Sequence, residues 1–226
     1  MVLYNKSKFE KLKIKFQNSE LIETNYSQSY QDMFVLSMLN GKRNGYFLEI
    51  GAYNPTFISN TFLLESGFDW KGISIDFDPM VQGNFVNSRK CNFILQDALT
   101  INYKELLSKH NAPKQIDYLQ IDIEPLTQTY ECLLKIPFDE YRFSVITYET
   151  DYYDTATPQD VKEKVREDSR NYLQSLGYEL VVGDVESNIG FPYEDWYVDP
   201  KIVNLETYKI LKESHDSLLP DHFMLF

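Results

Sequence analysis

The chain contains few cysteines and histidines, and this scarcity excludes several kinds of site. Its two cysteines, Cys91 and Cys132, lie far apart, and only three histidines occur among the 226 residues. Neither cysteine belongs to a C-x-x-C pair or to a Cys/His cluster, so the sequence indicates neither a zinc site nor a disulfide framework. We therefore expect a protein of a reducing compartment, with a cytoplasmic location.

Positive charge and long apolar runs are also lacking. The 22 Lys and Arg residues are outnumbered by 34 Asp and Glu residues, which gives a formal net charge of −12. Because an excess of acid repels a polyanion, this balance argues against a nucleic-acid partner. No apolar run approaches the roughly 18–20 residues needed to cross a bilayer, so we expect no transmembrane segment.

The N-terminal residues differ in charge from the rest of the chain. Residues 1–16 carry five lysines and one acid, Glu10, and no apolar stretch follows them as it would in a secretory signal. We expect residues 1–26 to form a basic segment, solvated beside a single domain of residues 27–226, because no repeat or linker divides that region. Alternatively, this segment could contact an anionic membrane or another subunit. The apolar tail Phe223–Phe226 could pack on its own domain or on a second subunit, which leaves a homo-oligomer open.

Apolar residues are abundant, and their spacing predicts alternating strands and helices. Short apolar runs typical of buried strands occupy Tyr46–Ile50, Gly72–Ile75, Asn92–Leu95, Tyr118–Ile123, Phe143–Tyr148 and Tyr178–Val182. Helices are predicted at Tyr30–Leu39, Thr61–Glu65, Met80–Asn87, Tyr103–His110, Thr127–Lys135, Pro158–Leu176 and Leu205–Ser214. This alternation predicts an α/β fold, with a mostly parallel sheet, helices on both faces and an antiparallel edge near the C-terminus.

Acidic residues and a glycine follow the predicted strands. In an open parallel sheet, ligands bind outside the carboxyl ends of the strands, where the strand order reverses. The residues at these ends are Glu49, Gly51, Asp76, Asp78, Asp97, Asp122, Glu124, Glu149 and Asp151. A single acid after a strand is usually a turn residue or a helix cap. The recurrence of this pattern after successive strands, however, predicts a ligand site along one rim of the sheet.

The glycine turn narrows the choice of ligand. A G-x-G-x-x-G motif is missing because Gly51 is followed by Tyr53 and Pro55, which argues against the pyrophosphate of a nicotinamide cofactor. Asp76 stands 25 residues after Gly51, where an acid can accept both hydroxyls of a ribose. A nucleoside without phosphate therefore fits, and S-adenosylmethionine, whose sulfonium is positive, suits an acidic rim.

Several motifs in order resemble the FkbM-type S-adenosylmethionine-dependent methyltransferases. They are S-Q-x-x-Q-D (Ser27, Gln28, Gln31, Asp32), F-L-E-I-G-A, S-N-T, I-D-x-D-P, I-D-Y-L-Q-I-D-I-E and V-I-T-Y-E, spread over residues 27–153. The resemblance implies a class I methyltransferase-like (Rossmann-like) sheet. It also implies that Glu49, Gly51, Asn60 and Thr61 surround the methionine end of the cofactor, with Asp76 on the ribose and Asp97 and Ala98 near the adenine. Pro125 stands where the family usually has glycine.

The same resemblance implies the reaction. Members of that family typically methylate hydroxyl groups, so we expect O-methyl transfer to a saccharide, a glycan or a similar polyhydroxylated acceptor. No histidine lies in a strand-end motif, so Asp122, Glu124 and Glu149 are the candidate catalytic residues, one of them acting as the base. Alternatively, Mg²⁺ or another divalent cation held by Asp122, Glu149 and Asp151 could lower the pKa of the acceptor hydroxyl.

Three further questions remain open. The chain could be a methyltransferase-like fold that acts as a non-catalytic binding or assembly module, and retention of cofactor binding would separate that from an enzyme. Glu194 and Asp195 could join the site, although we expect them in a solvated loop. Aromatic residues near these motifs could stack on a sugar ring or simply fill the core: Tyr148, Tyr152, Tyr153, Trp196 and Tyr197.

Overall fold

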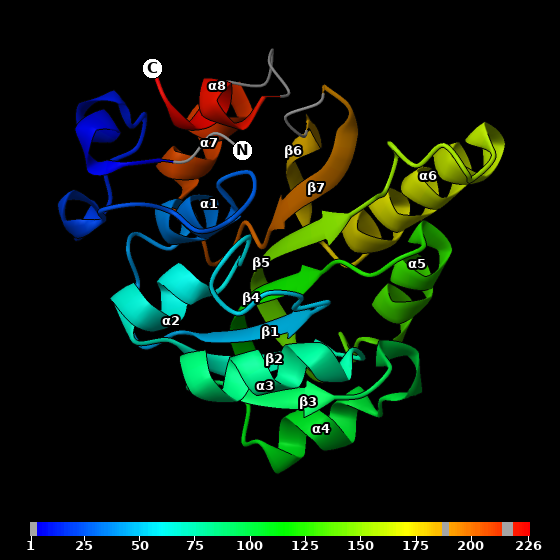
Figure 1. The fold of residues 1–226 in the computed structure, drawn as a ribbon. Helices are drawn as coiled ribbons and strands as arrows, with labels where there is room; N and C mark the ends of the chain where they lie inside the picture. Colours follow the sequence, from blue (N-terminus) through cyan, green and yellow to red (C-terminus); the bar gives the residue numbers. More distant parts are fainter. Residues whose placement is uncertain (1–3, 187–189, 214–218) are drawn as a thin grey trace.

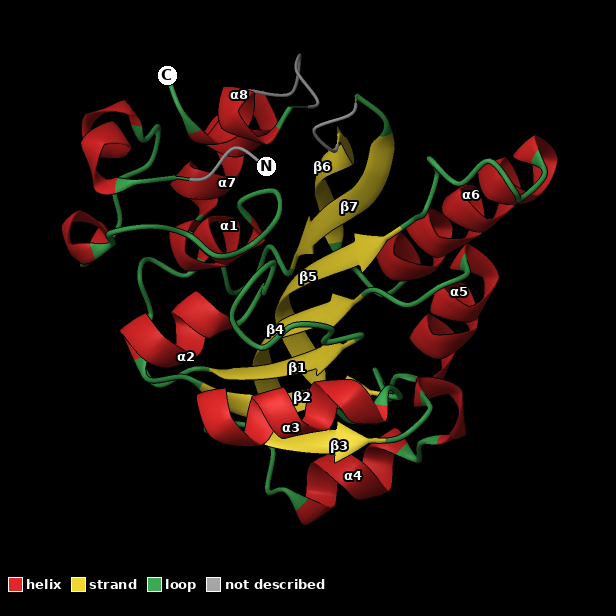
Figure 2. Ribbon diagram, in the orientation of Figure 1, coloured by secondary structure: helices red, strands yellow, loops and turns green. Residues whose placement is uncertain are grey.

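A seven-stranded mixed sheet forms the centre of the molecule (Figures 1 and 2) in a computed structural model that describes residues 4–186, 190–213 and 219–226. The strands are β1 Tyr46–Ile50, β2 Lys71–Asp76, β3 Asn92–Leu95, β4 Gln115–Ile121, β5 Arg142–Glu149, β6 Glu179–Glu186 and β7 Pro192–Val198. Their order is β3-β2-β1-β4-β5-β7-β6. Strands β1 to β5 pair in parallel, whereas β7 runs antiparallel between β5 and β6. This order is typical of the class I methyltransferase (Rossmann-like) fold and confirms the predicted fold class.

Helices cover both faces of the sheet. They are α1 Gln31–Met38, α2 Phe62–Phe68, α3 Pro79–Ser88, α4 Tyr103–Lys109, α5 Leu126–Lys135, α6 Gln159–Ser175, α7 Leu205–Glu213 and α8 Pro220–Met224, with 3-10 turns η1 Lys6–Lys11, η2 Ser19–Leu21 and η3 Ala98–Thr100. Helices α1, α2, α7 and α8 share one apolar cluster, and α4, α5 and α6 share a second across the sheet. The predicted helices are present within a few residues. The predicted end of α7 at Ser214 lies outside the described residues, and α8 was not predicted.

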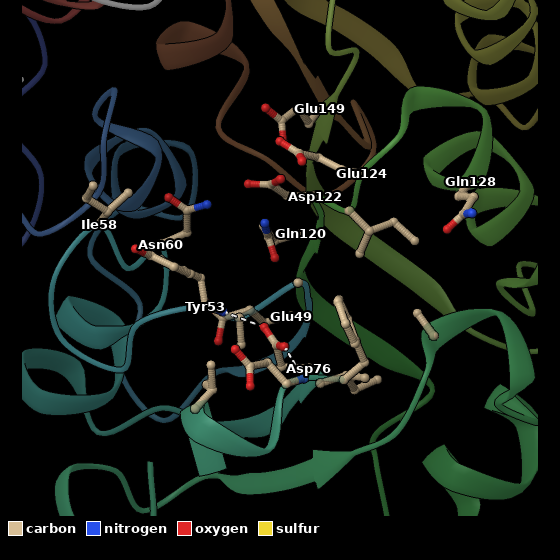
Figure 3. A pocket seen from close by; sticks show the side chains of 18 of the residues that line it. Glu49, Tyr53, Ile58, Asn60, Asp76, Gln120, Asp122, Glu124, Gln128 and Glu149 are labelled. Atoms are coloured by element: carbon tan, nitrogen blue, oxygen red, sulfur yellow. Dashed lines mark hydrogen bonds between the residues drawn. The ribbon is translucent and has the colours of Figure 1, made fainter. Parts of the chain in front are cut away.

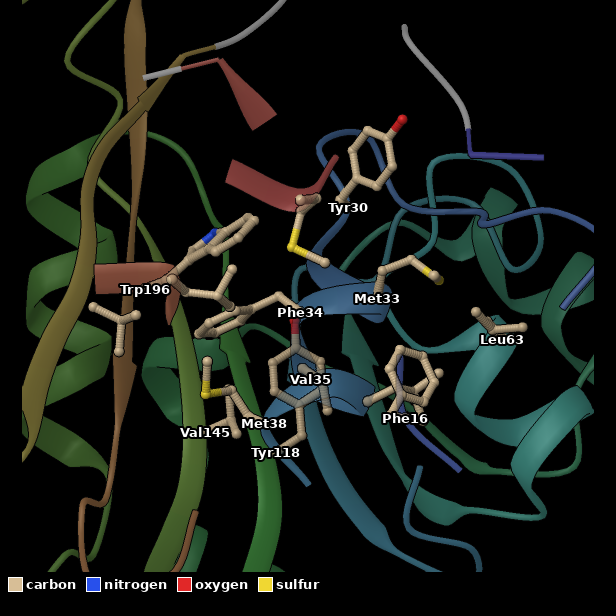
Figure 4. Packing of buried hydrophobic residues seen from close by; sticks show 14 of the residues in the cluster. Phe16, Tyr30, Met33, Phe34, Val35, Met38, Leu63, Tyr118, Val145 and Trp196 are labelled. Carbon is tan, nitrogen blue, oxygen red and sulfur yellow. The ribbon is translucent and has the colours of Figure 1, made fainter. Parts of the chain in front are cut away.

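Helix α1 lies at the centre of the first cluster (Figure 4). Each of its eight residues is buried, and the Phe34 ring stacks on Trp196 of β7 with centroids 4.4 Å apart. Tyr118 of β4 and Val145 of β5 form the floor beneath the helix. This packing fixes the loop before α1, which reaches toward the carboxyl ends of the strands.

The N-terminal segment is part of this core. Tyr4, Leu12 and Phe16 are buried among the residues of the first cluster, and Leu12 forms a β-bridge with Leu225. The expectation of a solvated flank is therefore wrong. The apolar residues of this segment are irregularly spaced and separated by lysines, so the sequence did not reveal that they are buried. Phe223 is likewise buried in the same cluster, so the C-terminal residues pack on their own chain.

Strand β7 also corrects a prediction. Glu194 and Asp195 were expected in a solvated loop, yet they lie on this strand with 2% and 0% of their surface exposed. Arg170 of α6 donates two hydrogen bonds to Asp195, both of 2.7 Å, and Gln31 donates one of 2.8 Å to Glu194. Buried carboxylates are tolerated where such donors are present. Within the described residues, no helix combines the length and apolarity required for a membrane span.

Candidate active site

A cavity of about 650 Å³ opens at the carboxyl ends of the five parallel strands (Figure 3). It adjoins the switch point between β1 and β4, because the strand order reverses there. Nine of the predicted site residues line it: Glu49, Gly51, Asn60, Asp76, Asp97, Ala98, Asp122, Glu124 and Glu149. The structure therefore brings most of the predicted rim together in one place. Gln28, from the loop before α1, lies on the same cavity.

Gly51 lies very close to the backbone of Asp122. Its φ angle is 82°, in the left-handed region that favours glycine. A Cβ atom at this position would lie 1.6 Å from the carbonyl oxygen of Asp122. The N–H of Asp122 in turn donates a 3.0 Å hydrogen bond to the carbonyl of Ile50. The glycine is thus required by the neighbouring backbone, a reason that the sequence did not reveal.

Asp76 is held at the mouth of the cavity by two backbone donors. One carboxylate oxygen accepts from the N–H of Tyr53 at 2.8 Å, and the other accepts from the N–H of Asp78 at 2.9 Å. Each carboxylate oxygen has a further lone pair for a ligand hydroxyl. Asp78 itself caps α3 by accepting from the N–H of Met80, and Asp97 similarly caps η3.

Glu49 and Thr61 are hydrogen-bonded to each other. The carboxylate of Glu49 accepts from the hydroxyls of Thr61 at 2.8 Å and Ser74 at 2.6 Å. Burial raises the pKa of Glu49, while the nearby Arg89 guanidinium and the two hydroxyls oppose that rise. Thr61 is absent from the described residues that line the cavity, so its place is in the support beneath the site.

Arg89 supports the site and could not be predicted from the sequence. Its side chain is fully buried and donates to Glu65 at 3.2 Å, to the Pro55 carbonyl at 2.9 Å and to the Thr61 hydroxyl at 2.8 Å. These bonds fix residues 55–61, the loop that brings Asn60 to the cavity. The partners lie 24 to 34 residues before Arg89, so no local motif could have revealed them.

The side chain of Asn60 offers the cavity an acceptor. Only 8% of the residue is exposed, and its Oδ1 atom has no hydrogen-bond partner among the described residues. Such a buried acceptor is satisfied when a ligand supplies an N–H or O–H group.

Acidic side chains gather at the other end of the cavity. Figure 3 shows Asp122, Glu124 and Glu149 there, from the ends of β4 and β5. Burial raises the pKa of Asp122 well above its usual range, and the negative charges of Glu194, Asp151 and Glu124 raise it further. Asp122 is therefore a stronger base than an ordinary aspartate when it is ionised.

A second cavity of about 440 Å³ adjoins the first. Its lining consists of Glu124, Pro125, Asp151, Tyr153 and Asp154, and it shares Glu124 and Tyr153 with the first cavity. Burial, followed by the charge of Glu124, raises the pKa of Asp151 to about 7, while the Tyr153 hydroxyl works in the opposite direction. Of the five aromatic residues considered for stacking, Tyr153 lines the cavities, whereas Tyr148, Trp196 and Tyr197 lie in the core.

The predicted metal site receives no support from the arrangement of these acids. Across residues 4–186, 190–213 and 219–226, no group of three or more His, Cys, Asp or Glu side chains is placed to hold a metal ion. Asp122 and Glu149 line the first cavity, but Asp151 lines the second. His215 lies outside the described residues.

Comparisons with known proteins give distant likenesses in structure. No protein-family model matches the chain, and no curated protein matches it. The structure is similar to an O-methyltransferase from Bacillus cereus in complex with SAH, at 14% identity over 77% of this chain and 82% of that chain, with a TM-score of 0.49.

It is also similar to a methyltransferase from Pyrococcus furiosus, at 15% identity over 83% of this chain and 89% of that chain, with a TM-score of 0.44. A third similar structure is the N-methyltransferase NodS from Bradyrhizobium japonicum WM9, at 10% identity over 74% of this chain and 93% of that chain, with a TM-score of 0.44. Likenesses this distant assign no activity, so the fold rests on the strand order itself.

Proposed function

We propose that the chain is an S-adenosylmethionine-dependent O-methyltransferase of the FkbM type, which methylates a hydroxyl of a saccharide, a glycan or a similar polyhydroxylated acceptor. The observation that supports this most is the cavity at the switch point of a class I methyltransferase sheet. Asp76, the residue proposed to bind the ribose, lines one end of this cavity, and a group of carboxylates lines the other (Figure 3).

The residues present fit the cofactor. Asp76 keeps free lone pairs for the ribose hydroxyls, and the buried Oδ1 of Asn60 suits the ammonium group of the methionine part. The close approach at Gly51 keeps the turn free of a side chain where the cofactor would pass. Asp97 and Ala98 line the same cavity beyond Asp76, where the adenine would lie.

The chain's own residues would position the acceptor and remove its proton. When bound, S-adenosylmethionine supplies an activated methyl group. Asp122, Glu124 and Glu149 face the acceptor end of the cavity, and the raised pKa of Asp122 suits it to take the hydroxyl proton. Holding the acceptor oxygen in line with the methyl group accounts for most of the expected rate enhancement.

Thermal unfolding with S-adenosylhomocysteine, the demethylated product, tests the proposal. A ligand at about a hundred times its Kd adds roughly 2.7 kcal/mol to the stability of the folded state. We expect a clear rise in Tm for the unaltered chain and none for Asp76→Ala. If the unaltered chain shows no rise at millimolar ligand, the enzyme assignment fails and the non-catalytic module is favoured.

A further inference from the structure

The two cavities carry charge of a single sign. Every charged residue that lines either of them within the described part of the chain is an Asp or a Glu. The donors of the lining are neutral groups, among them the amides of Gln120 and Gln128, whereas the charged groups supply acceptors alone. Such a lining favours a ligand that brings positive charge with it.

Asp151 provides a second, independent observation. Only 2% of the residue is exposed, it lines the second cavity, and neither of its carboxylate oxygens has a hydrogen-bond partner of normal geometry within residues 4–186, 190–213 and 219–226. The neighbouring Tyr153 hydroxyl favours the ionised form, but burial outweighs it and raises the pKa of Asp151. A buried carboxylate without a donor is costly, because it has lost its water and gained nothing in return.

Several other buried carboxylates of the molecule are supplied with donors. Asp195 receives two N–H groups of Arg170, and Asp32 receives the backbone N–H groups of Tyr26 and Ser27. Asp151 therefore differs from these structural carboxylates, whose oxygens accept hydrogen bonds from protein donors. Its oxygens are placed for a donor that comes with a ligand.

An ammonium group fits this position better than the alternatives. It brings three donors and a full positive charge on one atom. It can therefore donate to the oxygens of Asp151 and compensate the negative charge of the lining. A hydroxyl would bring one donor and leave the charge uncompensated. A divalent cation would need several ligands converging on one point, and the described residues offer no such group.

We propose that the second cavity binds a protonated amino group of the acceptor against Asp151, so that the acceptor is an amino sugar or an amino polyol. This inference rests on the proposed function. Glu124 and Tyr153 line both cavities, so an acceptor anchored at Asp151 presents a neighbouring hydroxyl at this junction. That is the side of the first cavity where Asp122 and Glu149 lie.

Binding of matched probes to the chain saturated with S-adenosylhomocysteine tests the inference. The charged probes are D-glucosamine and 2-deoxystreptamine, and their neutral counterparts are N-acetyl-D-glucosamine and myo-inositol. Calorimetric titration at neutral pH should give each charged probe an affinity about tenfold higher than that of its counterpart, which corresponds to about 1.4 kcal/mol.

The variant Asp151→Asn keeps the size of the side chain, and asparagine tolerates the positive φ of 45° at this position. We expect it to lose the preference for the charged probes while its affinity for S-adenosylhomocysteine stays unchanged. The matched control Glu105→Gln removes one carboxylate from an exposed position on α4 and should keep the preference.

Four results overturn the inference. They are equal affinity for charged and neutral probes, a preference that survives in Asp151→Asn, no binding of the charged probes to a chain that does bind S-adenosylhomocysteine, and displacement of the probes by stoichiometric Mg²⁺, which would indicate a metal site. If the variant does not fold, the paired probes on the unaltered chain decide the matter. A chain that fails to bind S-adenosylhomocysteine refutes the proposed function instead, so the two failures are distinguishable.

Discussion

The buried carboxylate of Glu194 should make the protein less stable as the pH rises. Burial raises its pKa from 4.5 to about 7, although hydrogen bonds from Trp196 and Gln31 oppose the rise. Between these two values the folded state holds a proton that the unfolded state has released. The free energy of unfolding therefore falls with increasing pH across this window and levels off above about pH 7.

The variant Glu194→Gln isolates this effect. The side chains of Gln31 and Trp196 both donate to the same oxygen, Oε2, each at 2.8 Å, so the single carbonyl oxygen of glutamine can accept both bonds. A rise in pKa from 4.5 to about 7 corresponds to about 3 kcal/mol. We expect the variant to match the parent near pH 4 and to exceed its stability by up to about 3 kcal/mol near pH 8.

Urea unfolding at several pH values measures this difference. Asp122 and Asp151 also have a raised pKa and add to the pH dependence of both proteins, so the difference between variant and parent reports on Glu194. Glu105→Gln, on the exposed surface of α4, serves as the control and should follow the parent. A variant that is less stable than the parent at about pH 8, or a difference that does not change with pH, would refute the reasoning.

Four other substitutions give expected outcomes. Asp76→Ala should abolish binding of S-adenosylhomocysteine, measured by calorimetry, without unfolding the chain; retained binding would contradict the ribose assignment. Glu149→Gln should leave that binding intact and reduce methyl transfer in a product assay, and full activity would remove it from the candidate catalytic residues. Arg89→Met should cost about 3–5 kcal/mol in urea unfolding because Glu65 loses its buried partner, whereas the exposed Arg43→Met should cost less than about 1 kcal/mol. Gly51→Ala should cost more than about 1 kcal/mol and weaken cofactor binding, since the added Cβ meets the Asp122 carbonyl; parent-like stability and affinity would show that the contact relaxes easily.

The parallel part of the sheet could be predicted because its signal is local. Strands β1, β2, β4 and β5 are buried over nearly their whole length, so each stands out as a short apolar run in the sequence. The acids at their carboxyl ends follow directly along the chain, and the parallel direction of the strands brings those ends together. Nine of the predicted site residues therefore line one cavity.

The remaining features depend on partners that are distant in sequence. Glu194 is 163 residues from Gln31, and Asp195 is 25 residues from Arg170, so the acidic sequence of β7 resembled a solvated loop. Arg89 could not be predicted either, because its acceptors lie between residues 55 and 65, on a distant loop and on α2. Thr61 belongs to the S-N-T motif, but its hydroxyl bonds to Glu49 beneath the site. A sequence motif does not distinguish a side chain that lines a cavity from one that supports it.

The contact between Gly51 and Asp122 joins the two halves of the cavity mechanically. The turn that would hold the cofactor rests directly against the backbone that begins the acidic loop after β4. A change in that loop that shifts Asp122 by even a small distance must also move the turn or open a gap beneath it. Attempts to redesign the acceptor preference should therefore keep residues 121–122 fixed and vary the chain from residue 123 onward, because specificity gained closer to the sheet would come with a loss of cofactor affinity.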